Sequence, residues 1–170
     1  GSFEDAGGGG FFFTSHDHEA LIHRSMPGHD NATPSGNGVA AQALIALGHL
    51  ACEPRYVAAA ERALHRFAPT IAEAPGGFAS LLVAIGDAES PPTEVLLAGD
   101  ADACGRWQRT LERGYRPRVR VFNLAGVADL PPALVKGAAP ATGARAWICR
   151  GTQCLPPVDA LDALVAALSA

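Results

Sequence analysis

The order of apolar and polar residues predicts three helices in the first half of the chain. Apolar residues recur there at helical spacing, and the predicted helices span residues 38–51, 54–67 and 77–86. The first helix is apolar around nearly its whole circumference, while the second is amphipathic, so the two together predict an antiparallel helical hairpin. Because the first helix needs cover on every side, we expect it to lie inside a larger assembly of helices.

The pattern changes after Pro91 and Pro92, where short apolar runs bounded by turn residues predict strands. The predicted strands span residues 94–100, 118–125 and 144–150, and helical segments are expected at 101–113 and 157–168. Strands that alternate with helices predict a small, mostly parallel, three-stranded α/β unit. The expected organisation is a flexible lead at 1–10, a helical hairpin region at 11–90 and this α/β unit at 91–170.

Composition narrows the partners that this mixed α and α/β chain could have. Its 170 residues carry a net charge of −4 and are 48% apolar, which fits one folded domain with at most a small appendage. That charge offers no basic field for a nucleic acid, so no nucleic-acid partner is expected. The longest uncharged stretch, Asn31 to Cys52, is too polar to span a bilayer, and no signal peptide is visible. We therefore expect a cytoplasmic protein without a membrane partner. The leading Gly-Ser, followed by residues with no cap or element of their own, suggests a fragment.

A polar corner before the first helix is the main candidate site. Backbone amides at a helix start, together with nearby hydroxyl, amide and carboxylate groups, could hold a polyhydroxylated or anionic ligand. The candidate ligand-binding residues are Asp30, Asn31, Thr33, Ser35, Asn37, Gln42 and His49. A plain N-cap at Ser35 or Thr33 with a tight turn explains the same corner and is the more frequent meaning of such a sequence. His49 could act as a general base, or it could simply lie at a helix C-terminus, which is the more common case.

Histidine and cysteine residues offer weaker candidates for chemistry. Four histidines, His16, His18, His23 and His29, fall close together, but exposed loop histidines are favoured over a metal site. The four cysteines are too few and too scattered for a disulfide framework, so free thiols are expected. Cys149 and Cys154 are interpreted as a buried strand thiol and a loop thiol, with redox chemistry as the minor alternative. No metal, cofactor or catalytic residue is assigned.

Several segments of the chain resemble a known family. They are GGFFFTSHDHEALIHR, DNATPSGNGVAAQALIALGHL, EVLLAGD and ARAWICRGTQCLPPVDALDAL, and DNATPSGN is the most specific. Together they look like the C-terminal part of the thioredoxin-domain-containing, N-acylglucosamine-2-epimerase-like family, over nearly the whole chain. That family is similar to six-hairpin glycosidases in having a toroid of paired helices, which follows a thioredoxin-like domain. Phe13 departs from the pattern, because members often have an acidic residue there.

The resemblance implies a function for the chain as part of a larger protein. It would supply the last one or two hairpins of the toroid and a terminal α/β appendage. Asp30, Thr33, Ser35 and Asn37 would then lie at the mouth of an inner helix and face a central cavity, with a sugar as ligand. The expected function is one wall of the cavity of a carbohydrate-active or sugar-isomerase/epimerase-like protein, without catalysis by this chain alone.

The alternative function is a non-enzymatic interaction module. In that case the apolar helix at 38–51 is covered by a second copy of the chain or by another partner, because so large an apolar surface is unusual on a monomer. The expected partners are therefore a sugar ligand and either a second copy or the missing N-terminal part of the parent protein.

Overall fold

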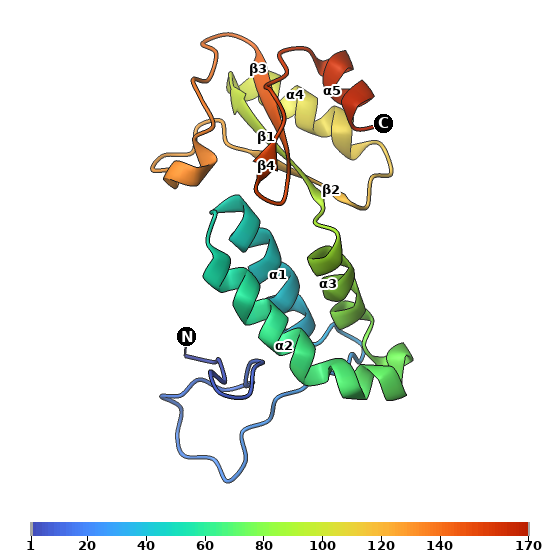
Figure 1. Cartoon of the computed structure of the whole chain (residues 1–170). Coiled ribbons are helices and arrows are strands. Elements are labelled where there is room, and N and C mark those ends of the chain that lie inside the picture. Colours follow the sequence, from blue (N-terminus) through green and yellow to red (C-terminus); the bar gives the residue numbers. More distant parts are fainter. Residues whose placement is uncertain (1, 170) are drawn as a thin grey trace. The chain divides into compact units, whose positions relative to one another are not determined.

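The chain forms two compact units, Gly1–Pro91 and Pro92–Ala170, in a computed structural model that describes residues 2–169 (Figure 1). Each unit has its own hydrophobic core. Among the described residues, no helix combines the length and the apolar character needed to cross a bilayer.

Helices make up most of the first unit. Helix α1 spans Gly36–Leu50, α2 spans Pro54–Glu73, a 3₁₀ turn spans Pro75–Gly77 and α3 spans Ala79–Glu89. Ser35 is the N-cap of α1, since its hydroxyl accepts a hydrogen bond from the Gly38 amide at 3.0 Å. Helix α2 was expected to end near Phe67 but continues past Pro69, because Ile71 extends its buried stripe by a further turn.

Helix α1 packs against both α2 and α3. The approach to α3 is very close at Gly38, where an added Cβ would lie 2.0 Å from Ser80 Oγ. Residues of this chain alone do not cover α1 on all sides, and its cover by a larger assembly of helices stays a prediction. Val39 and Leu47 remain 52% and 49% exposed, because the two neighbouring helices leave one face of α1 open.

Residues 2–10, expected as a flexible lead, fold back toward α2. Glu4 and Phe11 form an isolated antiparallel bridge, and the Phe12 amide donates to the Phe3 carbonyl at 2.8 Å. Gly9 has a φ of 77°, and a Cβ there would meet the carbonyl oxygen of Arg62 at 2.5 Å. A glycine is therefore required where the returning chain touches α2.

A four-stranded sheet with helices forms the second unit. In chain order the elements are β1 (Thr93–Gly99), α4 (Ala101–Glu112), β2 (Val119–Asn123), a 3₁₀ turn (Pro132–Leu134), β3 (Ala144–Arg150), β4 (Gln153–Cys154) and α5 (Leu161–Ala167). Asp100 caps α4 by accepting a hydrogen bond from the Ala103 amide at 2.9 Å. The final helix is shorter than the predicted 157–168, and Val158 instead forms a bridge with Ala146.

The sheet is mixed, with strand order β2-β1-β3-β4, so the prediction of a mostly parallel three-stranded sheet is wrong. Only β1 and β2 are parallel, connected by α4 as a crossover helix. The link from β2 to β3 contains a short 3₁₀ turn in place of an α-helix, and β3 pairs antiparallel with β1. Strand β4 was missed because it has only two residues and follows a two-residue turn.

The two faces of this sheet have different surroundings. Val95, Leu97, Ala146 and Ile148 belong to the hydrophobic core that includes residues of α4 and α5. The alternate positions point to the opposite face, where Glu94, Leu96, Trp147 and Cys149 are also buried. A buried glutamate therefore shares a sheet face with a cysteine.

Candidate ligand-binding site

Asp30 joins the starts of two helices in the first unit. Its carboxylate accepts hydrogen bonds from the Ser35 amide, which precedes α1, and from the Ser80 amide in the first turn of α3, each at 2.7 Å. The Ser80 hydroxyl also donates to Asp30. Burial alone would raise the pKa of Asp30, but the hydrogen bonds from Ser80 and Ser35 together lower it.

Asn37 fastens the N-terminal segment to α1. Its side chain is only 1% exposed, and its Oδ1 accepts from the Phe11 amide at 2.7 Å. Its Nδ2 donates to the carbonyl oxygens of Phe11 and Pro27, both at 2.9 Å. The side-chain amide of Asn37 therefore forms hydrogen bonds with two separate stretches of backbone, at Phe11 and at Pro27.

The other predicted ligand residues have varied surroundings. Ser35 is the helix cap, and Gln42 Nε2 donates to the Ser80 carbonyl at 2.8 Å. Asn31 and Thr33 are exposed, and His49 is partly buried in the last turn of α1. Most of the polar groups in this corner thus form hydrogen bonds with other parts of the same chain. Ligand binding by them stays a prediction.

Two adjoining hollows lie beside this corner. The first has a volume of 320 Å³ and the second 460 Å³. The first is lined by Phe3, Phe11, Phe12, Phe13, Pro27, Gly36, Asn37 and Ala40. The second is lined by Ser2, Phe3, Glu4, Phe11, Leu44, Arg55, Tyr56, Ala59 and Arg62. Phe3 and Phe11 line both, and Asn37 is the one predicted ligand residue that lines either of them.

Charged side chains contact residues that line these hollows. Arg62 and Glu4 form an ion pair at 2.5 Å, and the hydrogen bond from Arg62 lowers the pKa of Glu4. The guanidinium of Arg24 lies over the ring of Phe12, 4.0 Å from its centre. The hollows are therefore lined by both aromatic and hydrogen-bonding side chains.

Sequence reasoning missed the aromatic lining. The signal was the run Phe11-Phe12-Phe13, three large apolar residues in a segment with neither helical nor strand periodicity. Large apolar side chains in such a segment can be buried only against the surface of another element. In the structure Phe11 and Phe12 are partly buried, whereas Phe13 remains 75% exposed.

The histidines near the N-terminus are all exposed, which agrees with the favoured interpretation of His16, His18, His23 and His29 as loop residues. Within residues 2–169, no three histidine, cysteine, aspartate or glutamate side chains gather in a way that could hold a metal ion.

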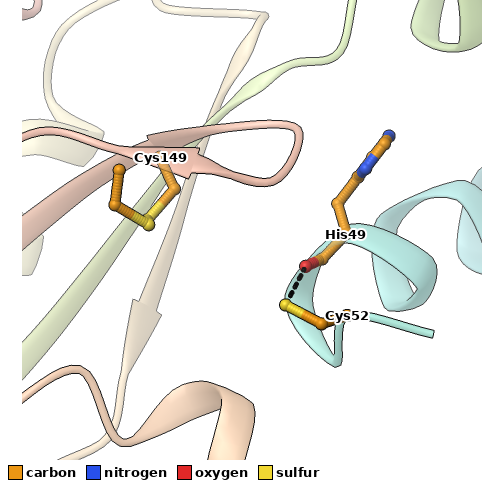
Figure 2. Close-up of a disulfide and its surroundings, with 4 residues drawn as sticks. His49, Cys52 and Cys149 are labelled. Carbon is orange, nitrogen blue, oxygen red and sulfur yellow. Dashed lines mark hydrogen bonds between the residues drawn. A yellow bond between two sulfur atoms is a disulfide. The ribbon is translucent and has the colours of Figure 1, made fainter. Parts of the chain in front are cut away.

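The cysteines of the second unit correct another expectation. Cys149 and Cys154 form a disulfide, so the prediction of free thiols is wrong for this pair (Figure 2). The hairpin of β3 and β4 brings them directly opposite each other, which their spacing alone did not indicate. Cys52 and Cys104 are free thiols. The Cys52 sulfur lies 3.9 Å from the His49 carbonyl oxygen, and Figure 2 marks this contact with a dashed line.

No family model and no curated protein matches this chain in the comparisons with known proteins. The family resemblance carried by DNATPSGN and its companion segments therefore remains a prediction.

Proposed function

We propose that the first unit binds a carbohydrate in the two adjoining hollows and supplies one wall of the ligand cavity of a carbohydrate-active, sugar-isomerase or epimerase-like protein. The observation that carries this proposal is the phenylalanine lining at the N-terminal end of α1, next to the buried amide of Asn37. Ligand sites are typically concave and mostly apolar, with a few placed polar groups.

Sugar chemistry suits such a surface. The C–H faces of a pyranose ring can stack on aromatic side chains, while its hydroxyls need donors and acceptors at the edge. Phe11 and Phe13 would provide the stacking surface, and Glu4, Tyr56 and Arg62 would provide the polar partners. We assign this wall a binding role, because catalysis also requires an acid and a base held on both sides of an enclosed substrate.

A sugar titration tests the proposal directly. In the 170-residue chain, N-acetylglucosamine and a disaccharide at millimolar concentration should shift the NMR signals of Phe11, Phe13 and Tyr56. Phe13→Ala should weaken binding by roughly fivefold, since an aromatic stacking contact contributes about 1 kcal/mol.

Tyr115→Ala provides the matched control, because Tyr115 is 92% exposed and belongs to the second unit. The sugar affinity of the Tyr115→Ala variant should equal that of the unchanged chain. Absence of any shift in the phenylalanine signals, or equal weakening by the two substitutions, would contradict a sugar site in these hollows.

Self-association is the second candidate function, and the open face of α1 favours it. Val39 and Leu47 on α1 are about half exposed, as is Val83 on α3. Such a face is a plausible contact for a second copy of the chain. Light scattering should show a dimer or larger species that Val39→Ser together with Leu47→Ser converts to monomer.

The control for this experiment is Ile22→Ser, since Ile22 is fully exposed in the N-terminal segment and away from α1 in the sequence. That variant should keep the mass of the unchanged chain. A monomer at every concentration tested would rule out self-association through α1.

A further inference from the structure

The disulfide of the second unit joins a buried residue to an exposed one. Cys149 belongs to β3 and is buried, whereas Cys154 belongs to β4 and is exposed. Cys149 and Cys154 are paired residues of the β3–β4 hairpin, whose turn is Gly151 and Thr152. Figure 2 draws the disulfide at Cys149. An external thiolate can therefore reach the Cys154 sulfur first, with the Cys149 sulfur as the leaving group.

A buried glutamate is the cross-strand partner of the residue that carries the leaving sulfur. Glu94 on β1 is directly opposite Cys149 in the antiparallel register, so both side chains are on the same face of the sheet. Glu94 is only 3% exposed, and burial raises its pKa to about 7, although Arg120 and Lys136 act to lower it. This group can hold or release a proton near neutral pH, as a proton donor to a thiolate must.

The charges that face Glu94 come from two other segments. Arg120 on β2 is its parallel partner, and Lys136 lies in the connection between β2 and β3. Both are cations that favour the ionised carboxylate, while burial favours the neutral acid. Near pH 7, Glu94 is therefore divided between its neutral and its ionised form.

We propose that Cys149–Cys154 is a thiol–disulfide exchange site, in which Glu94 serves as the proton donor and acceptor for Cys149. This role belongs to the second unit and is independent of carbohydrate binding by the first. The chemical class of its substrate is a thiol or a disulfide, supplied by a monothiol such as glutathione or by a dithiol.

The reduction proceeds in two balanced steps. A thiolate attacks the Cys154 sulfur, the bond between Cys154 and Cys149 breaks, and the released Cys149 thiolate takes the proton of neutral Glu94. A second thiolate then attacks the external sulfur of the mixed disulfide and releases Cys154, which is protonated by solvent. Two external thiols are oxidised to one disulfide, and the protein disulfide is reduced to two thiols.

The reverse direction oxidises the protein at the expense of an external disulfide. Cys154 forms a mixed disulfide with it, and ionised Glu94 accepts the proton of the Cys149 thiol. Cys149 then attacks the Cys154 sulfur, which restores the protein disulfide and releases the second external thiol.

The order of attack can be tested by trapping mixed disulfides in the folded 170-residue chain. The background is Cys52→Ser, because Cys52 is an exposed free thiol that would otherwise react. Treated with glutathione disulfide, the Cys149→Ser variant should form a glutathione adduct on Cys154 at least about tenfold faster than the Cys154→Ser variant forms one on Cys149, because thiol reactivity follows exposure. Equal rates in the two variants would overturn the assignment of Cys154 as the attacked sulfur.

Separate reductants identify the source of the thiol. Folded protein is incubated with glutathione or with dithiothreitol, and thiols are counted by alkylation and mass spectrometry. Reduction by glutathione supports a monothiol partner, and reduction by dithiothreitol alone supports a dithiol partner. If neither reduces the disulfide until the chain is unfolded by urea, the bond is structural and the exchange site is ruled out.

The proton-transfer role of Glu94 predicts a particular pH profile. The rate at which Cys149 resolves the mixed disulfide should increase through about pH 7 in the unchanged chain, following the ionisation of Glu94. In Glu94→Gln the rate at neutral pH should fall by about tenfold or more, and the rise near pH 7 should disappear.

Lys136→Gln supplies a second variant in case Glu94→Gln perturbs the fold. Removal of this cation should move the midpoint of the profile to higher pH, because Lys136 lowers the pKa of Glu94. A Glu94→Gln profile identical to that of the unchanged chain, or a Lys136→Gln midpoint that does not move, would contradict the proton-transfer role.

Discussion

Glu94 couples the stability of the second unit to pH. Its pKa is about 7 in the folded chain against 4.5 for an ordinary glutamate, because burial penalises the charged form. In the pH range between these values the unfolded chain ionises Glu94 while the folded chain keeps it neutral. The contribution of neutral Glu94 to the free energy of unfolding is therefore fully present below about pH 4.5. It is lost as the pH rises through about 7.

The Glu94→Gln variant should lack this dependence, since glutamine stays neutral throughout. Relative to the variant, the unchanged chain should lose up to about 3 kcal/mol of unfolding free energy between pH 4.5 and 8. The measurement is urea denaturation followed by tryptophan fluorescence, because Trp107 and Trp147 both lie in the second unit. A constant difference between the two proteins across this range would show that Glu94 does not have a raised pKa.

Individual residues were predictable from the sequence where their partners are close along the chain. Ser35 was one of two N-cap candidates, and it could be proposed from the sequence because a cap contacts an amide only three residues away. The contact between Asp30 and Ser80 spans 50 residues, and no local pattern indicates it. The same holds for Glu94 and Cys149, which only the antiparallel register of β1 and β3 brings together.

The contact between α1 and α3 depends on one glycine. An alanine at Gly38 would place its Cβ 2.0 Å from Ser80 Oγ and 2.6 Å from Ser80 Cβ. Ser80 cannot easily move away, because it donates to Asp30 through both its amide and its hydroxyl. Gly38→Ala should therefore destabilise the first unit by about 2 kcal/mol, even though alanine favours a helix.

Gly36→Ala is the matched control within the same helix, as nothing lies within 4 Å of a Cβ at Gly36. It should leave stability unchanged or increase it slightly. Urea denaturation followed by circular dichroism compares the two variants. Equal stabilities for Gly36→Ala and Gly38→Ala would mean that α1 and α3 are not in close contact at this point.

Elements with strong periodicity were predicted well. The strand at 144–150 agrees with β3, and the helix at 101–113 differs from α4 by one residue at its end. Sheet topology was not predictable, because the direction of β3 depends on the path of residues 124–143, where proline breaks leave no helical period. Pairing of β4 depends on a turn that carries no strand pattern of its own.

At the scale of the whole molecule, the change in pattern at Pro91 and Pro92 coincides with the border between the two compact units. Apolar periodicity identifies which residues need cover, but it does not say which surface covers them. The open face of α1 illustrates this limit, since Val39 and Leu47 fit the predicted apolar helix and yet stay exposed. The toroid that the resemblance implies would bring further helices to that face, and it stays a prediction.

Asp30 also sets a practical limit on shortening the protein. A version of the chain cut to begin at α1 would remove the acceptor for amides at two helix starts that lie far apart in the sequence. It would also discard the Phe11 and Pro27 carbonyls that satisfy the buried amide of Asn37. The stretch before the first helix therefore acts as an internal clamp, and any trimmed form intended for crystallisation should retain it.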